Sequence, residues 1–195
     1  ITAYGSPNYV QLQILLKKNG LSLNDIQLEI VGTEAIVPAL VNKRVDAICF
    51  SMLRTFELRY QGIEVDEFKS DEFLPSFGNV VVTGDKILNE NRDLAVRFTR
   101  ALSRVMAYLS DPENMKEATV VAIAKYAPTY IGREEYMSDI LSEIYAGYLW
   151  QSEDTEAFGF GFGNVERWQQ TIDIMREYDL ITTDVNAADF VVPRL

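Results

Sequence analysis

The sequence predicts an α/β fold in which a parallel-sheet lobe is followed by a mostly helical section. In the first third of the 195 residues, short apolar runs alternate with helical patterns, which is typical of parallel strands joined by crossover helices. Beyond Gly84 the pattern changes to helices only. The hydrophobic fraction of 48% is enough for a packed core, so we expect a folded protein.

The first part of the chain supplies the predicted strands and three helices. Pro7 suits the first position of a helix because it lacks the N–H that would be unpaired there, and Asn19-Gly20 can end that helix. Thr33 is expected to cap a second helix. Residues 51–60 are expected to form a third helix. Apolar runs between turn signals predict strands at residues 1–4, 28–32, 45–50, 63–68 and 79–83.

The second part of the chain is predicted to be helical. Its first helix carries an apolar stripe at 3.6-residue spacing that runs from Leu94 through Phe98 to Leu109 and ends at Asp111-Pro112. The composition changes near Thr83, which is the best internal boundary. Further helices are predicted at residues 115–126, 134–149 and 164–178.

Charge and composition exclude several functions. The chain has 18 Lys and Arg against 29 Asp and Glu, a net charge of -11, so nucleic acid is not expected as a partner. It has no His and one Cys, Cys49, which excludes Ser-His and Cys-His triads and Cys- or His-rich zinc sites within the chain. No D-x-D-x-D-G loop supports a cation site. We therefore predict no catalytic residue, no metal and no cofactor.

The N-terminal end resembles no targeting segment. It has neither a basic region nor an apolar core of a signal peptide, and no stretch approaches the about 18 uninterrupted apolar residues that span a bilayer. Residues 1–4 look like the end of a strand that enters a turn without a lead-in. We therefore expect that an N-terminal region precedes them.

The Gly5-Ser6-Pro7 turn is the first candidate binding feature. It brings unpaired backbone N–H groups, the Ser6 hydroxyl and the positive end of a helix dipole to one point, which suits a carboxylate, phosphate, sulfonate or polar heteroaromatic edge. Helix capping by Ser6 explains the turn equally well. The absence of a G-x-G-x-x-G or Walker loop disfavours nucleotide binding.

The segments after the predicted strands supply the other candidates, since open parallel sheets bind ligands at the carboxyl ends of their strands. Glu57 could accept paired hydrogen bonds from an amine and a ring nitrogen, although a solvated surface acid is the alternative. Aromatic side chains such as Tyr9 and Phe77 can stack on a planar ligand or pack in the core. The predicted ligand-binding residues are Gly5, Ser6, Pro7, Tyr9, Thr33, Ser51, Arg54, Glu57, Phe77 and Asn79.

Three Phe-Gly steps run through residues 158–163. Their glycines prevent a regular helix while the phenylalanines supply apolar contact. The run suits a loop that lies against a cleft, and a packed Ω-like loop without ligand contact is the alternative.

Several blocks match a family pattern in order over almost the whole chain. After the Gly5-Ser6-Pro7 turn they are Val31-Gly32, Ala39-Leu40 and Val45-Asp46-Ala47, then Arg54-Thr55-Phe56-Glu57-Leu58 with Gly62-Ile63, then Asn91-Arg92-Asp93-Leu94, Arg100-Ala101-Leu102 and Asp111-Pro112-Glu113, and finally Glu166-Arg167-Trp168-Gln169-Gln170-Thr171. These blocks resemble the substrate-binding proteins of ABC importers for nitrate, sulfonates and thiamine pyrimidine precursors, the last branch above all.

The resemblance implies a type II periplasmic-binding-protein fold, in which two α/β lobes hinge around a cleft and close on the ligand. Residues 1–78 would form the α/β lobe two, and residues 79–195 the strand and helical part that return to lobe one, whose N-terminal part is absent. It also implies a small-molecule ligand, an ABC permease as partner, and a periplasmic or extracellular location, with a lipid anchor in the full-length protein as an option.

The predicted function is therefore binding of a small planar heterocycle, such as a pyrimidine precursor of thiamine biosynthesis, in an interlobe cleft. Riboflavin, a sulfonate or nitrate-type ligand, and a sensory module on the same fold are the alternatives within binding. A synthase of the thiamine pyrimidine is the enzymatic alternative. The synthase has a Cys-rich loop where this chain has residues 75–79 without a thiol, so we favour binding over catalysis.

Overall fold

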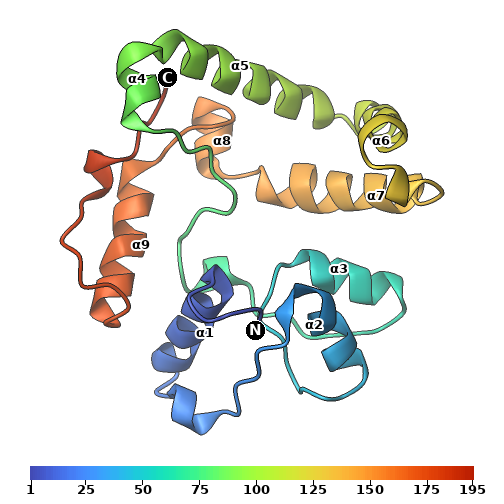
Figure 1. The fold of residues 1–195 in the computed structure, drawn as a ribbon, viewed down its shortest axis with the longest axis vertical. Coiled ribbons are helices and arrows are strands. Elements are labelled where there is room, and N and C mark those ends of the chain that lie inside the picture. Colours follow the sequence, from blue (N-terminus) through green and yellow to red (C-terminus); the bar gives the residue numbers. More distant parts are fainter. The chain divides into compact units, whose positions relative to one another are not determined.

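The computed structural model describes residues 1–195, and it consists of helices and their connections without a β-strand (Figure 1). None of the helices has the length and apolar character that crossing a membrane requires. The α-helices are α1 (Pro7–Lys18), α2 (Gly32–Val41), α3 (Leu53–Tyr60), α4 (Asp85–Glu90), α5 (Arg92–Leu109), α6 (Pro112–Tyr126), α7 (Glu134–Ile140), α8 (Glu153–Phe158) and α9 (Val165–Glu177). The others are the 3₁₀ turns η1 (Leu23–Asp25), η2 (Ser70–Glu72), η3 (Pro128–Tyr130) and η5 (Ala187–Asp189), and the π-helix η4 (Leu141–Leu149).

The predicted α/β fold with a parallel-sheet lobe is wrong, because none of its five strands forms. Residues 1–4 precede α1, and the other four segments lie in connections between helices, except that Gly32 begins α2. Only Ile1 has the bonding pattern of a parallel ladder: its terminal nitrogen donates to Glu29 O at 3.0 Å, and its carbonyl accepts from Val31 N at 3.1 Å. A strand requires that pattern to repeat along a partner segment distant in the sequence. An apolar, β-branched run favours an extended backbone but does not supply that partner.

The apolar side chains of these connections are nevertheless packed. Ile36 and Val37 of α2 and Leu58 of α3 form a buried core. Alternate residues of two predicted strands, Ile48 with Phe50 and Ile63 with Val65, pack against it, as the two-residue period of an extended backbone allows although no ladder forms. The residues that pack on this core are Val31, Leu40, Ile48, Phe50, Ile63 and Val65.

Helix α1 begins and ends where the sequence signals predicted. Ser6 is the N-cap and Pro7 the first helical residue, while Asn19 is the C-cap and Gly20 follows with a φ of 70°. The predicted Thr33 cap is wrong. Helix α2 already begins at Gly32, which has a φ of 73° and turns the chain into the helix, so Thr33 lies inside the first turn.

The chain divides into two compact units. The first comprises residues 1–76 and 166–189, and the second residues 77–165 and 190–195. Helix α9 therefore belongs to the unit that contains α1, α2 and α3, whereas the sequence placed everything from residue 79 onward in the other part. The assignment of residues 1–78 and 79–195 to two binding-protein lobes stays a prediction.

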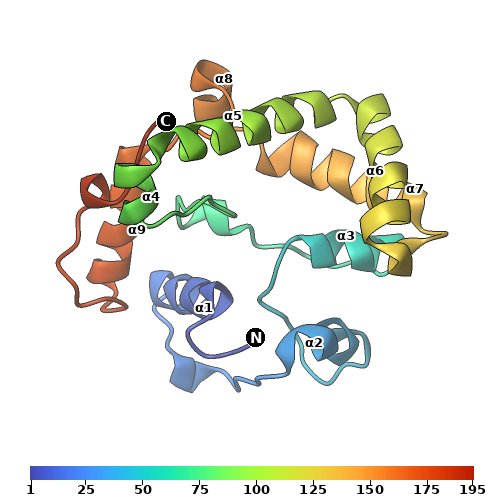
Figure 2. The same ribbon diagram turned by 45° about the horizontal axis from the view of Figure 1, so that its top comes forward.

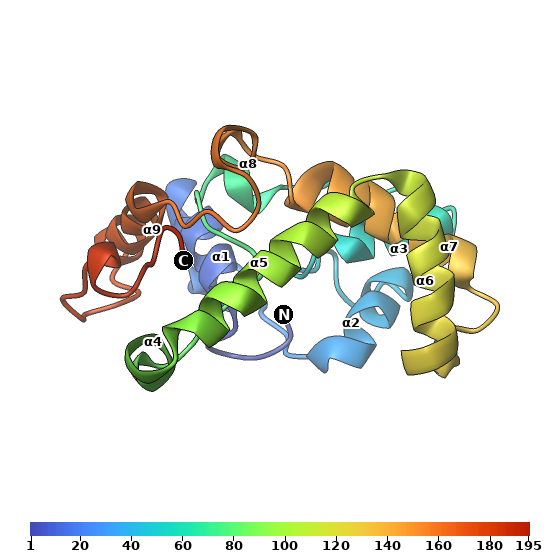
Figure 3. The ribbon, with the colours of Figure 1, turned by 90° about the horizontal axis from the view of Figure 1, so that it is seen from above.

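In the second unit, α5, α6, α7 and η4 pack on one another (Figures 2 and 3). Helix α6 starts at Pro112, before the predicted start at residue 115, because Asp111 caps it by accepting from Glu113 N at 2.9 Å. It buries Met115 and Ile123. The helix predicted at residues 134–149 is α7 followed by the π-helix η4, for which the sequence has no periodic signal. The apolar stripe of α5 is exposed at Leu94, Phe98, Leu102 and Val105.

The Phe-Gly run forms a loop packed within the second unit. The rings of Phe158 and Phe162 stack with centroids 4.3 Å apart, and Gly159 and Gly161 take φ values of 85° and 82° that favour glycine. Ser103 Oγ donates to the carbonyl of Phe160 at 3.1 Å. The C-terminal segment adds two bonds, from Gly163 N to Pro193 O at 3.0 Å and from Arg194 to Phe158 O at 2.8 Å.

We expect Gly163→Ala to destabilise the second unit by about 1 to 3 kcal/mol, the range for overpacking. A Cβ at this position would lie 3.0 Å from the carbonyl oxygen of Val192 and 3.1 Å from Cγ1 of Val191, so the C-terminal segment must shift. Urea unfolding followed by circular dichroism measures the change. Gly78→Ala is the matched control, because a Cβ there meets nothing within 4 Å. Equal unfolding midpoints for the two variants would contradict the prediction.

Candidate functional site

The turn before α1 is held by its own serine. Gly5 has a φ of 72°, and Ser6 Oγ accepts from Tyr9 N at 3.3 Å while donating to Ala3 O at 2.8 Å. The ring of Tyr9 packs edge-on against Tyr4 with centroids 5.3 Å apart. The Ser6 hydroxyl therefore caps α1, and a part of this turn in ligand binding stays a prediction.

A contact across 41 residues brings the segment before α3 to the start of α1. Cys49 Sγ donates to the carbonyl of Asn8 at 3.2 Å, and Asn8 Nδ2 donates to Thr2 Oγ1 at 3.4 Å. The candidate turn at Gly5 to Tyr9 and the segment that leads into Ser51 are thus linked within the first unit. Burial raises the pKa of the Cys49 thiol, and the positive N-terminus opposes this shift.

We expect Cys49 to react slowly with iodoacetamide at pH 8.5 in the folded protein, because the thiolate is the nucleophile and burial disfavours it. Unfolding in urea restores the ordinary pKa and should speed alkylation, as measured by mass spectrometry. The raised pKa also means that the unfolded chain loses its thiol proton first, so stability decreases as the pH rises above the ordinary cysteine pKa. Equal alkylation rates with and without urea would contradict the expected burial.

Helix α3 carries a compact pair of charged side chains beside an aromatic ring. Arg54 Nη1 lies 2.6 Å from Glu57 Oε2, and the guanidinium carbon lies 5.2 Å from the centroid of the Phe50 ring. The two charged side chains keep 33% and 27% of their exposure, so the pair is partly withdrawn from water. The hydroxyl of Ser51 accepts from Leu53 N at 3.4 Å at the start of this helix.

This cluster offers complementary polar atoms to a planar ligand. The guanidinium of Arg54 carries five N–H donors, of which the Nε–H is buried without a hydrogen-bond partner. Glu57 is acceptor-only when ionised, so it suits an amine or ring N–H. The guanidinium of Arg54 lies beside the ring of Phe50, and flat, polarisable ligand groups can stack on both. The residue types of this cluster suit a heterocycle, and a binding role for them stays a prediction.

The remaining predicted residues belong to other elements of the chain. Thr33 is exposed in the first turn of α2. Phe77 is half-buried and Asn79 exposed, and both belong to the second unit. No group of His, Cys, Asp and Glu side chains could hold a metal ion. The structure thus pairs Arg54 with Glu57, and it leaves the binding roles of all ten predicted residues as predictions.

Sequence reasoning missed a second cluster, in which α9 holds the chain just before Phe77. Arg167 and Thr171 both donate to the carbonyl of Pro75. Their spacing of four residues places them on one face of a helix, which the sequence did indicate. Nothing in the sequence indicated that Pro75, more than ninety residues earlier, would lie opposite that face.

Comparisons with known proteins relate this chain to a family and to a characterised relative. Residues 2–115 match the family described as NMT1/THI5 like. The riboflavin-binding protein RibY of Chloroflexus aurantiacus is 24% identical over 180 residues, which cover 92% of this chain and 50% of that protein. The chain thus spans about half the length of this relative. No solved structure matches the chain.

Proposed function

Because the chain belongs to the NMT1/THI5-like family, we propose that it is part of the solute-binding component of an ABC importer and that its ligand is a planar nitrogen heterocycle, with riboflavin the first candidate. The family and the relative support a solute-binding protein rather than an enzyme. The observation that carries riboflavin is the match to a riboflavin-binding protein over 92% of this chain.

The Arg54 and Glu57 cluster supports a ligand of this class. A flavin ring has an N–H donor between two carbonyl acceptors, and this edge is complementary to a carboxylate beside a guanidinium donor. In this assignment Glu57 accepts from the ring N–H and the partly exposed guanidinium of Arg54 donates to a neighbouring carbonyl. Phe50, already stacked with Arg54, supplies the apolar surface.

A thiamine pyrimidine precursor is the second candidate. The block from Arg54 to Leu58 resembles the branch that binds such precursors, and an aminopyrimidine also presents amine donors to Glu57. Residues 75–79 contain no thiol, which separates the chain from the Cys-rich loop of the related synthase. An ABC permease as partner and a periplasmic or extracellular location complete the proposal.

Parallel calorimetric titrations test this proposal. The full-length protein is titrated with riboflavin, a 4-aminopyrimidine, nitrate and an alkyl sulfonate under the same conditions. We expect saturable heat with riboflavin and quenching of its fluorescence. Saturation by the aminopyrimidine alone would select the second candidate. Binding of nitrate or sulfonate alone, or of none of the four, would overturn the assignment to a planar heterocycle.

A further inference from the structure

Helix α5 packs on its own unit through its polar side, and its apolar side is exposed. Ser103 Oγ donates to the carbonyl of Phe160 at 3.1 Å. Thr99 and Met106 lie one helical turn before and after Ser103, and both are half-buried. The apolar stripe on the opposite side has exposed fractions between 37% and 57% at Leu94, Phe98, Leu102 and Val105. Packing within the second unit therefore does not account for this stripe.

Arginine side chains border the apolar stripe of α5. Arg97, Arg100 and Arg104 follow one another at spacings of three and four residues, which places them on one side of the helix. Arg97 comes three residues after Leu94, so the basic side lies next to the apolar one. All three arginines are exposed. Helix α5 thus combines apolar surface and positive charge in a chain whose net charge is -11.

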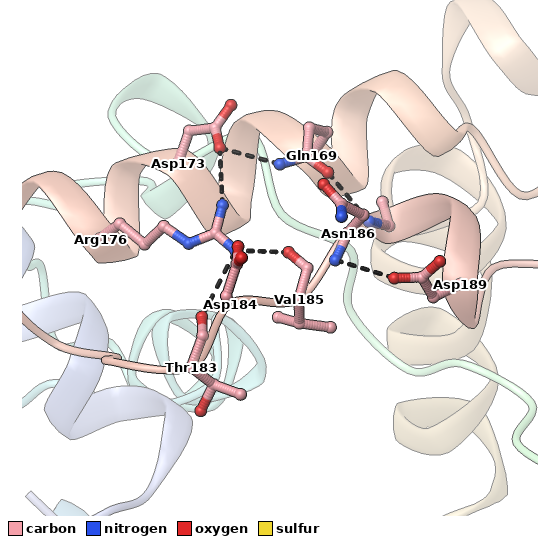
Figure 4. A network of polar contacts seen from close by, with 9 residues as sticks. Gln169, Asp173, Arg176, Thr183, Asp184, Val185, Asn186 and Asp189 are labelled. Carbon is pink, nitrogen blue, oxygen red and sulfur yellow. Dashed lines mark hydrogen bonds and ion pairs between the residues drawn. The ribbon is translucent and has the colours of Figure 1, made fainter.

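The positive charge of α5 is not neutralised within the chain. Arg100 and Arg104 form no ion pair, and Arg97 pairs only with Asp93, at 2.8 Å, where both side chains are exposed. An exposed pair of this kind contributes little. Arg176 of α9 differs, because its guanidinium bonds backbone carbonyls and carboxylates of its own unit (Figure 4). The arginines of α5 are therefore open to anionic groups outside the chain.

We infer that α5 is a docking surface for an anionic lipid membrane. The helix lies parallel to the membrane plane, with its apolar stripe among the headgroups and its arginines on lipid phosphates. A helix with a large apolar face bordered by basic side chains binds at such an interface. Four arginines and one aspartate among its 18 residues exclude a position across the hydrocarbon core. The rest of the chain is acidic, so electrostatic attraction favours approach through α5.

Charge complementarity favours a lipid surface over a second copy of the chain. In an antiparallel pair of α5 helices, the basic sides of the two copies would face each other, and like charges repel. Lipid phosphates carry the opposite charge. The inference goes beyond the proposed function and does not depend on the identity of the ligand. Such a surface would hold the proposed solute-binding protein close to the membrane that contains its permease.

The test measures binding of the full-length protein to lipid vesicles by flotation. The vesicles contain phosphatidylcholine alone or phosphatidylcholine with phosphatidylglycerol, each at low and at high salt. Val105→Asn removes apolar surface from α5, and the double variant Arg100→Gln/Arg104→Gln removes two charges. The matched controls are Val121→Asn and Lys116→Gln, because they make the same kinds of change at exposed positions of α6 in the same unit.

We expect the wild-type protein to bind only the vesicles that contain phosphatidylglycerol, and high salt to release it because salt screens the attraction. The double arginine variant should bind about 25-fold more weakly, since each basic side chain near such a surface contributes about fivefold. Val105→Asn should weaken binding about five- to tenfold, as loss of one inserted apolar side chain implies. Both controls should bind as the wild type does.

Several results would overturn the inference. Equal binding to both kinds of vesicle would remove the role of charge, and equal losses in the α5 and α6 variants would remove the role of α5. Without vesicle binding, a dimer that Val105→Asn dissociates in sedimentation would assign the stripe to a second copy. With neither, another part of the full-length protein covers it. Riboflavin affinity is measured separately and should not change in the α5 variants, so failure of the proposed function is distinguishable.

Discussion

Leu58→Ala is expected to lower the free energy of unfolding of the first unit by about 2 to 5 kcal/mol, the range for truncating a buried leucine. Leu58 retains only 2% of its exposure and packs with Ile36 and Val37 in the core of this unit. Alanine removes apolar contact and leaves a cavity between two helices. Because no β-ladder joins the extended segments around this core, side-chain packing is their main support.

Urea unfolding followed by circular dichroism measures this loss. Leu21→Ala is the matched control in the same unit, since Leu21 is 44% exposed and its truncation should cost less than about 1 kcal/mol. Leu58→Met, which nearly conserves volume, should cost less than about 1.5 kcal/mol. If Leu58→Ala were as harmless as Leu21→Ala, the core around α2 and α3 would not be packed as described.

Glu57→Gln is expected to weaken ligand binding by about 1.5 to 3 kcal/mol, the range for a hydrogen bond to a charged group, or about ten- to hundredfold in affinity. The substitution keeps the size of the side chain but replaces half of the carboxylate by an amide donor. A heterocycle that donates an N–H to Glu57 then meets an acceptor without charge. The partly withdrawn ion pair with Arg54, at 2.6 Å, makes this carboxylate a directed acceptor.

Calorimetric titration of the full-length protein with riboflavin and an aminopyrimidine measures the effect. Glu64→Gln is the control, because it makes the same charge change at an exposed position of the same unit. Its affinity should equal that of the wild type. If Glu57→Gln and the wild type bind every ligand with equal affinity, the prediction is wrong and Glu57 is a solvated surface acid.

Local signals in the sequence predicted the ends of helices well. Ser6-Pro7 begins α1, as predicted, because a cap bonds an N–H only two or three residues away. Asp111-Pro112 was predicted only as the end of the preceding helix, and it also begins α6. The prediction that Thr33 caps α2 rested on the same kind of local signal and was wrong. Gly32 has a φ of 73° and is itself the first residue of the helix, so the cap position falls at Val31, and a backbone angle is not visible in a pattern of residue types.

The candidate site was accessible from the sequence only where its residues are neighbours on one element. Arg54 and Glu57 are three residues apart on α3, so their contact follows from helical geometry. Two other contacts do not follow from any local pattern, because they join distant segments: Cys49 with Asn8, and Arg167 with Pro75. Tertiary packing decides such contacts.

The sequence by itself determined the family, the exclusion of triad and zinc chemistry, and most of the helices, because a helix closes its hydrogen bonds within four residues. The tertiary structure alone decided that the apolar runs would pack on α2 and α3 without pairing into a sheet, and that α9 would join the first unit. A ladder and an interhelical contact depend on partners far along the chain. The pattern of residue types indicates which side chains are buried, whereas the segments that bury them are determined by tertiary packing.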